Sequence, residues 1–158
     1  MFNVSLTSAM ERRIGVIVNP DAGLGGRLAM KGSDGMAEIA RAKGAEDRAG
    51  PRMKEALEHL NSIIELSPIS WDQVNWFLPE GRMGDSWVPE KMKNLGQWHN
   101  ICLTPESTSA SDTIQVVHSL IEEKVELILY SGGDGTTRDI IGALEDIDSA
   151  STPILGVP

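Results

Sequence analysis

Cysteine is nearly absent from this sequence of 158 residues, which contains one, Cys102. A single cysteine excludes an intrachain disulfide and is typical of a protein in the reducing cytoplasm. The segment around it, WHNICL, is largely apolar, so we expect a packed strand residue and not a nucleophile. The N-terminus lacks a basic region followed by an apolar core, and therefore shows no signal peptide. No apolar run approaches the roughly 20 residues that a membrane span needs.

Positive charge is also scarce, because 14 basic residues stand against 23 acidic residues and give a formal net charge of −9. Nucleic-acid binding depends on Lys and Arg side chains that neutralise phosphates, so nucleic acid is not an expected partner. Attraction to an anionic membrane surface is disfavoured for the same reason. Any phosphate bound by this chain must be held locally, through backbone N–H groups, a few cations or a metal ion.

Short apolar segments alternate with segments of helical periodicity along the chain. The apolar segments predict strands within residues 13–18, 74–78, 98–104, 125–133 and 152–158. The periodic segments predict helices over residues 51–66, 109–124 and 135–146. This alternation is typical of a parallel sheet with helices on both faces. We therefore expect one domain over residues 1–158 with a three-layer, Rossmann-like α/β fold.

Two glycine-rich loops follow the first and the fourth predicted strands. If the strand order is 3-2-1-4-5, these two strands are neighbours at the point where the order reverses. Ligands of open α/β sheets bind at such a point, beyond the carboxyl ends of the strands. The two loops should then face each other across a ligand site.

The second of these loops, SGGDGTT at residues 131–137, carries the clearest chemistry. Its three glycines let the chain turn sharply and bring backbone N–H groups against a ligand, and the helix that follows adds a partial positive charge. Both features favour an anion, most simply a phosphate. Asp134 would repel a phosphate unless it binds Mg²⁺ or accepts a proton from an attacking hydroxyl. The alternative is a helix cap, supplied by Asp134 or Thr136.

The first loop, NPDAGLGGRLAMKGSDG at residues 19–35, adds cations and a second carboxylate. Arg27 and Lys31 are four residues apart and would share a face on a helical turn, which suits a phosphate contact. If the loops meet, Asp34 can approach Asp134 or share a metal ion with it. The alternative is that these three side chains of the first loop are solvated charges.

The segment SGGDGTTRD resembles the GGDGT motif shared by NAD kinases, by diacylglycerol and sphingosine kinases and, in a related form, by phosphofructokinases. The segment GVIVNPDAGLGGRLAMKGSDG is more selective. It resembles the opening of the ATP-NAD kinase-like group, which includes proteins labelled acetoin catabolism protein X. The chain therefore resembles the N-terminal domain of this family.

This resemblance implies phosphorylation of the 2′-hydroxyl of the adenosine ribose of NAD, which gives NADP. It further implies ATP or inorganic polyphosphate as the phosphoryl donor, Mg²⁺ or another divalent cation, and a homo-oligomeric full-length protein. The motif assigns activation of the hydroxyl to Asp134, and we expect the divalent cation at Asp134 and Asp34 if the two loops meet. The residues expected to bind nucleotide or phosphate are Asn19, Gly25, Gly26, Lys31, Gly32, Asp34, Gly35, Gly132, Gly133, Gly135, Thr136 and Thr137.

The sequence departs from the family's pattern at its end. NAD kinases also have a C-terminal all-β domain, with an Asn-Glu motif that helps to hold NAD, and PILGVP stands where that domain should begin. We therefore expect a fragment or a truncated product whose acceptor site is incomplete, so that the isolated chain is inactive. A lipid kinase domain and a non-catalytic, nucleotide-binding regulatory module are the alternatives. The first loop with KGSDG favours NAD kinase over lipid kinase, as does the lack of an apolar or basic membrane-facing stretch.

Overall fold

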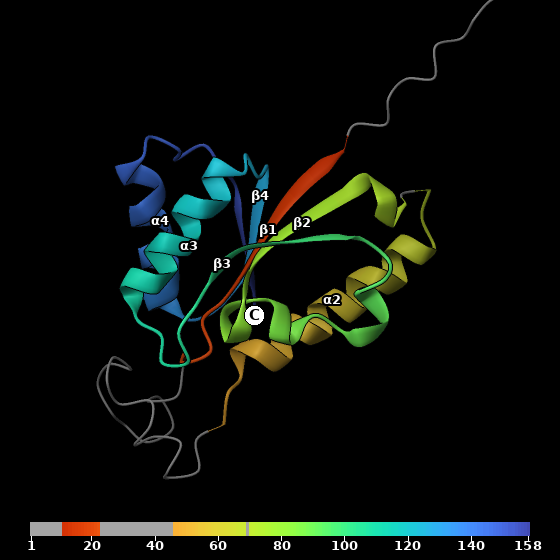
Figure 1. Ribbon diagram of the computed structural model, residues 1–158, viewed down its shortest axis with the longest axis horizontal. Coiled ribbons are helices and arrows are strands. Elements are labelled where there is room, and N and C mark those ends of the chain that lie inside the picture. Colours follow the sequence, from red (N-terminus) through yellow and green to blue (C-terminus); the bar gives the residue numbers. More distant parts are fainter. Residues whose placement is uncertain (1–10, 23–45, 69) are drawn as a thin grey trace, which may run out of the picture.

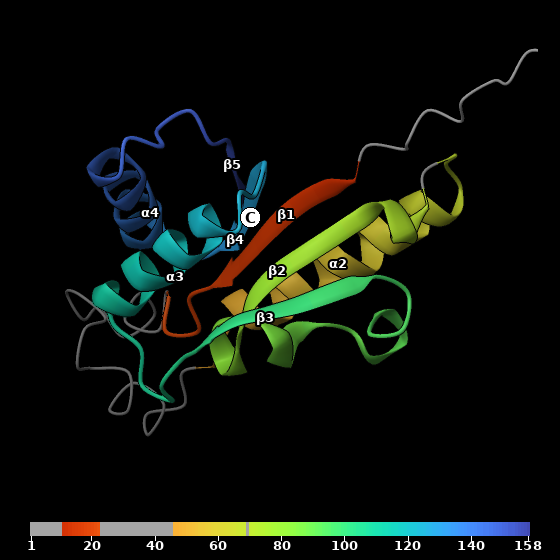
Figure 2. The same ribbon diagram turned by 45° about the horizontal axis from the view of Figure 1, so that its top comes forward.

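A computed structural model describes residues 11–22, 46–68 and 70–158 of the chain. Its core is one five-stranded sheet in which every adjacent pair of strands is parallel, in the order β3-β2-β1-β4-β5. The strands are β1 (Arg12–Val18), β2 (Val74–Glu80), β3 (Gln97–Leu103), β4 (Leu127–Ser131) and β5 (Ile154–Val157). The observed order is the one in which the first and fourth strands are neighbours, and Figure 2 shows β1 lying between β2 and β4.

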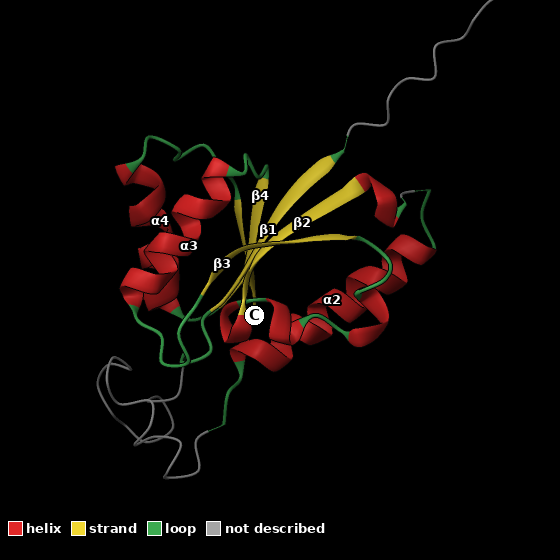
Figure 3. Ribbon diagram, in the orientation of Figure 1, coloured by secondary structure: helices red, strands yellow, loops and turns green. Residues whose placement is uncertain are grey.

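Helices cover both faces of this sheet, which confirms the predicted three-layer architecture (Figures 1 and 3). The helices are α2 (Ala49–Glu65), α3 (Ala110–Glu122) and α4 (Asp134–Asp146). On one face, α2 places Met53 and Leu57 against Val16 and Val18 of β1. On the other face, α3 and α4 pack against the side of the sheet that carries Ile17.

The central strands are apolar on both faces because both faces are covered. In β1 the buried residues run without a break from Gly15 to Val18, with Val16 and Val18 on the α2 side and Ile17 on the opposite side. Such a continuous run is what a parallel sheet between two helical layers requires. A Cβ at Gly15 would lie 2.9 Å from the side chain of Leu120, so α3 packs directly on the backbone of β1.

The sequence of the segment between β2 and β3, GRMGDSWVPEKMKNLG, predicts a loop with a turn of helix. It forms three short 3₁₀ helices, η3 (Gly81–Met83), η4 (Asp85–Trp87) and η5 (Glu90–Met92). A fourth, η2 (Trp71–Gln73), precedes β2. The indole N–H of Trp98, on β3, donates to the carbonyl oxygen of Met92, the last residue of η5, at 3.0 Å. This hydrogen bond holds the end of η5 against β3, in a segment whose sequence has no helical periodicity.

Three tryptophans, Trp71, Trp76 and Trp98, pack against one another around β2 and β3. The rings of Trp76 and Trp98 stack with centroids 5.2 Å apart, and Trp71 lies 5.6 Å from Trp76. The indole N–H of Trp71 donates to the buried Asn61 of α2 at 2.9 Å. Cys102 is half-buried on β3, where burial raises the pKa of its thiol, with a hydrogen bond to Ser119 opposing that rise.

No helix in the described part of the chain is long and apolar enough to cross a membrane. The first glycine-rich loop falls largely outside the described residues, which end at Ala22 and begin again at Glu46. Predictions for Gly25, Gly26 and the residues that follow them up to position 45 therefore lie outside it.

Candidate active site

The carboxyl ends of β1 and β4 lie side by side at the point where the strand order reverses. Val18 is in register with Ser131, and the backbone N–H of Asn19 donates to the carbonyl oxygen of Ser131 at 2.9 Å. The first loop leaves β1 here, and the SGGDGTT loop leaves β4. The structure thus brings the beginnings of the two loops together at the edge where open α/β sheets bind ligands.

The side chain of Asn19 joins these two loops. Its amide Nδ2 donates to Oγ1 of Thr136 at 2.9 Å, and its Oδ1 accepts the backbone N–H of Asp21 at 3.1 Å. Thr136 is only 2% exposed, so its hydroxyl is engaged inside the protein. Both residues were predicted to bind nucleotide; in the structure they fix the first turn of α4 against the end of β1.

The three glycines of the second loop differ in what the fold requires of them. A Cβ at Gly132 would lie 2.5 Å from Oγ1 and 2.6 Å from Cβ of Thr136, so packing alone demands glycine there. At Gly133 and Gly135 an added Cβ would meet no atom of the described residues within 4 Å. Gly133 also has φ −103° and ψ −172°, an extended conformation that any residue adopts. Neither backbone strain nor packing among the described residues explains glycine at these two positions.

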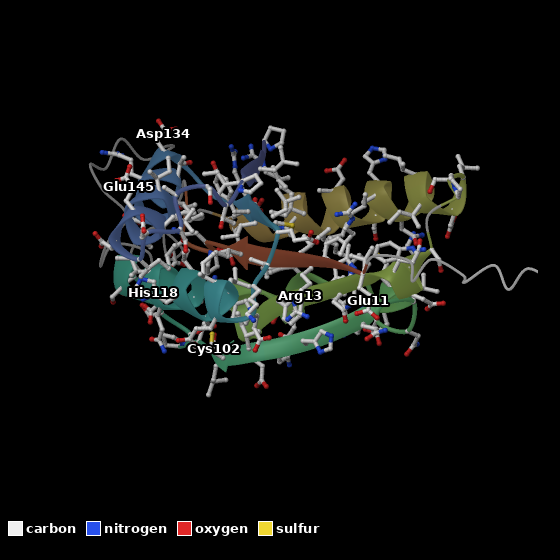
Figure 4. The ribbon with its side chains drawn as sticks, turned by 90° about the horizontal axis from the view of Figure 1, so that it is seen from above. Glu11, Arg13, Cys102, His118, Asp134 and Glu145 are labelled. Carbon is white, nitrogen blue, oxygen red and sulfur yellow. The ribbon has the colours of Figure 1, made fainter. Side chains whose placement is uncertain are left out.

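Asp134 is the first residue of α4, and Figure 4 shows it projecting outward from the end of the helix. The residue is exposed, and within the described ranges its carboxylate has no hydrogen-bond or ion-pair partner. The N-cap is Gly133, and no side chain caps this helix. The alternative reading, in which Asp134 or Thr136 caps α4, is therefore wrong.

The hydroxyls that flank this loop have different roles. The side chain of Thr137 pairs with the Tyr130 hydroxyl at 2.8 Å and donates to the carbonyl oxygen of Gly133 at 3.3 Å. These contacts connect the loop to the end of β4. Ser131 was not among the predicted site residues. It is 1% exposed, and its hydroxyl has no partner in the part of the chain that the structure describes. A buried polar atom without a partner is costly, which makes Ser131 a group that could serve a ligand.

The residues present could supply one carboxylate ligand of a magnesium site that is completed by substrate phosphates. Mg²⁺ favours oxygen ligands, keeps several waters and is commonly held by one or two carboxylates together with substrate phosphates. Asp134 offers such a carboxylate, next to the start of a helix that favours phosphate. The described residues contain no group of three or more Asp, Glu, His or Cys side chains that could hold a metal ion by themselves. Asp34, the other predicted ligand, lies outside the described ranges, as do Lys31, Gly32 and Gly35.

A second polar cluster beside the site was not predicted from the sequence. Arg82 of η3 contacts Asp47 at 2.7 Å and Asp21 at 3.7 Å, and donates to the carbonyl oxygen of Glu106 at 2.9 Å. The Thr108 hydroxyl donates to Asp21 at 3.2 Å. The residues of this polar cluster come from four separate segments of the chain, so no local sequence motif predicts the cluster.

A parallel sheet in this order defines an open, doubly wound α/β protein, a class that binds its ligands at the switch point between the loops described above. The family described as "ATP-NAD kinase N-terminal domain" matches residues 14–158. Because the match covers most of the chain, the chain belongs to this family. No curated protein and no solved structure matches it.

Proposed function

We propose that this chain is the N-terminal, catalytic-loop domain of a NAD kinase. The reaction is phosphoryl transfer from ATP or polyphosphate to the 2′-hydroxyl of the adenosine ribose of NAD. One observation carries the proposal: Asp134 is an exposed carboxylate without a partner in the described structure, and it stands between two glycines that the described fold does not require. Membership of the family supports kinase chemistry.

In this proposal the backbone around Gly133 and Gly135 binds donor phosphates. The N–H groups of the first turn of α4 have no partner within the helix, and the helix macrodipole places partial positive charge beside them. The absence of side chains at the two glycines leaves room for phosphate oxygens to approach these groups. The hydrogen bond between the buried Thr136 and the half-buried Asn19 keeps the first turn in place, so that little ordering is required when the donor binds.

Asp134 then acts on the acceptor. Its carboxylate accepts the proton of the attacking 2′-hydroxyl or orients that hydroxyl toward the phosphorus atom. Mg²⁺, when bound, neutralises charge on the transferring phosphoryl group. Asp134 would be its ligand from the described residues, with Asp34 as the proposed second carboxylate.

The proposal divides the substrates between domains. The chain supplies the loops at the ends of β1 and β4, and the NAD pocket would be completed by a C-terminal all-β domain of the family type. NAD and the donor are the proposed partners, in a cytoplasmic and homo-oligomeric full-length protein. The net charge of −9 gives no support to a nucleic-acid partner.

The replacement Asp134→Asn tests this assignment. It removes the charge and the proton acceptor while it keeps the shape, so NADP formation by the full-length protein should fall by about 100-fold or more. Donor affinity measured without catalysis should change far less. Asp146→Asn, an exposed carboxylate at the other end of α4, is the matched control and should retain full activity.

The same variant separates the alternatives. If the protein is a binding or regulatory module, neither the parent protein nor Asp134→Asn forms NADP, and both bind nucleotide. If it is a lipid kinase, the parent protein phosphorylates diacylglycerol or sphingosine and not NAD. Unchanged NADP formation in Asp134→Asn would remove Asp134 from the mechanism.

A further inference from the structure

Two acidic residues, Asp21 and Asp47, flank residues 23–45, which we call the first glycine-rich segment because they contain most of the first loop. Asp21 follows β1 by three positions, and Asp47 precedes α2 by two. The residues from 23 to 45 connect them. Figures 1 and 2 both place the end of β1 and the start of α2 at the same end of the sheet, beside η3.

Arg82 of η3 contacts both of these residues through one nitrogen atom. Its Nη2 lies 2.7 Å from Oδ2 of Asp47 and 3.7 Å from Oδ1 of Asp21. Its Nη1 donates to the Glu106 carbonyl oxygen at 2.9 Å, so Arg82 also contacts the segment that follows β3. The Arg82 side chain is 21% exposed and that of Asp21 is 7% exposed, so solvent screens these contacts less than it screens surface ion pairs.

Arg82 is itself held in place from the backbone outward. The Trp87 indole N–H donates to the carbonyl oxygen of Arg82 at 2.7 Å, and the backbone N–H of Gly81 donates to Asp85 at 2.7 Å. Trp87 in turn packs against Gly50 in the first turn of α2 so closely that no Cβ would fit there. The guanidinium is therefore presented by a preorganised segment, which reduces the entropy lost in forming its hydrogen bonds.

The start of α2 has no local device that could replace this contact. Its N-cap is Arg48, no side chain caps the helix, and its first turn contains no acidic residue. A helix without a cap depends on tertiary contacts to fix its first turn. The contact of Arg82 with Asp47, one position before the N-cap, is such a contact.

We infer that Arg82 is a positioning residue that ties the two ends of the first glycine-rich segment to each other and to the carboxyl edge of the sheet. Through this tie it sets where that segment begins and ends relative to Asn19 and Asp134. The consequence for catalysis rests on the proposed function; the tie itself does not. Arg82 is not assigned a direct phosphate contact, because two carboxylates already lie against its guanidinium.

A distance measurement tests the tie without reference to any reaction. Spin labels are placed on Glu46→Cys and Glu145→Cys, both exposed positions, in a Cys102→Ala background that removes the native thiol. The label pair should give a narrow distance distribution in the parent protein. It should broaden with Arg82→Met and narrow again with Arg82→Lys, which restores the charge but not the fork. An unchanged distribution in Arg82→Met overturns the inference.

Arg13→Met is the matched control for loss of a half-buried arginine. Arg13 contacts one carboxylate where Arg82 contacts two, that of Glu123 at 3.1 Å, and it likewise donates to one carbonyl oxygen, at 2.7 Å, but it lies at the start of β1. The length of a seven-residue strand, roughly 20 Å, separates it from the site. Arg13→Met should lower the thermal stability to a similar extent and leave the label distances unchanged. If it broadens them equally, the effect of Arg82 is general destabilisation and the inference fails.

Kinetics of the full-length protein then test the consequence. Arg82→Met should reduce kcat/KM for NADP formation by roughly 10- to 100-fold at a temperature where the variant is folded. Asp47→Asn, which leaves Arg82 in place, should reduce it in the same direction, and the double variant should lose little more than Arg82→Met alone. If Asp47→Asn keeps or raises kcat/KM while Arg82→Met lowers it, Arg82 binds the donor directly and the positioning role is refuted. No NADP formation in the parent protein would refute the proposed function, and the label distances would still decide the tie.

Discussion

Replacing Gly132 and Gly133 by alanine, one at a time, separates the glycine that the fold needs from the glycine that a ligand needs. At Gly132 the new Cβ would lie 2.5, 2.6 and 2.7 Å from Oγ1, Cβ and Cγ2 of Thr136. All three atoms belong to one β-branched side chain, so a rotation about χ1 does not relieve the contact. Thr136 must move as a whole, and its hydrogen bond with Asn19 is disturbed when it does.

The expected magnitudes differ enough to be measured. Overpacking of this kind costs about 1–3 kcal/mol, and a disturbed hydrogen bond adds about 1 kcal/mol. Gly132→Ala should therefore lower the Tm by roughly 5–15 °C. Gly133→Ala meets no described atom within 4 Å, and the backbone there is extended. Its free energy of unfolding should stay within about 1 kcal/mol of the parent value, since the lost N-cap preference and the reduced entropy of the unfolded chain oppose each other.

At Gly133, substitution should affect donor binding more than it affects stability. Gly133→Ala should weaken ATP or polyphosphate binding despite its normal stability, and Gly133→Val, with a larger side chain in the same extended conformation, should abolish it. Thermal unfolding and calorimetric titration of the same samples give both quantities. A Gly133→Ala variant that is as unstable as Gly132→Ala, or a Gly133→Val variant with unchanged donor affinity, would refute the reasoning.

Three further predictions follow from buried or half-buried polar groups. Asn19→Ala removes the partner of the Thr136 hydroxyl and should lower the free energy of unfolding by about 1–3 kcal/mol, as measured in urea. Trp71→Phe leaves the buried Asn61 oxygen without its indole donor and should cost a similar amount, whereas the double variant with Asn61→Leu should recover part of that loss. The raised pKa of Cys102 predicts alkylation slower than that of a free thiol at pH 8, with a rate that rises at higher pH than is usual for the ordinary thiol range. Because the unfolded chain loses this proton first, the same shift predicts that stability falls as the pH rises through that range.

The parallel sheet between two helical layers could be predicted from the sequence because local patterns determine the alternation of strands and helices. Apolar runs such as residues 13–18 alternate with helical segments, and glycine-rich loops after the first and fourth strands indicate the switch point. The sequence offers Ser109 or Ser111 as the N-cap of the helix over residues 109–124, and the structure has Ser109 there, in a capping box with Asp112. The extents of the strands follow less closely, since β1 begins one residue earlier than predicted and β2 continues to Glu80.

The roles of individual site residues could not be predicted in the same way. Asn19 and Thr136 belong to the two motifs, but only the fold shows that they bind each other, across 117 positions of sequence. Arg82 contacts Asp47 across 35 positions and lies in a segment with no periodic pattern. The distinction between Gly132 and Gly133 depends on where Thr136 points, which no residue pattern encodes.

The formation of NADP by the full-length protein tests the central claim most directly. The assay contains NAD, Mg²⁺ and either ATP or polyphosphate, and Asp134→Asn serves as the control. We predict NADP with at least one donor in the parent protein and a rate reduced by about 100-fold or more in the variant. No NADP with either donor, from a protein that is folded and binds nucleotide, would contradict the assignment of Asp134 and its glycines to phosphoryl transfer onto NAD.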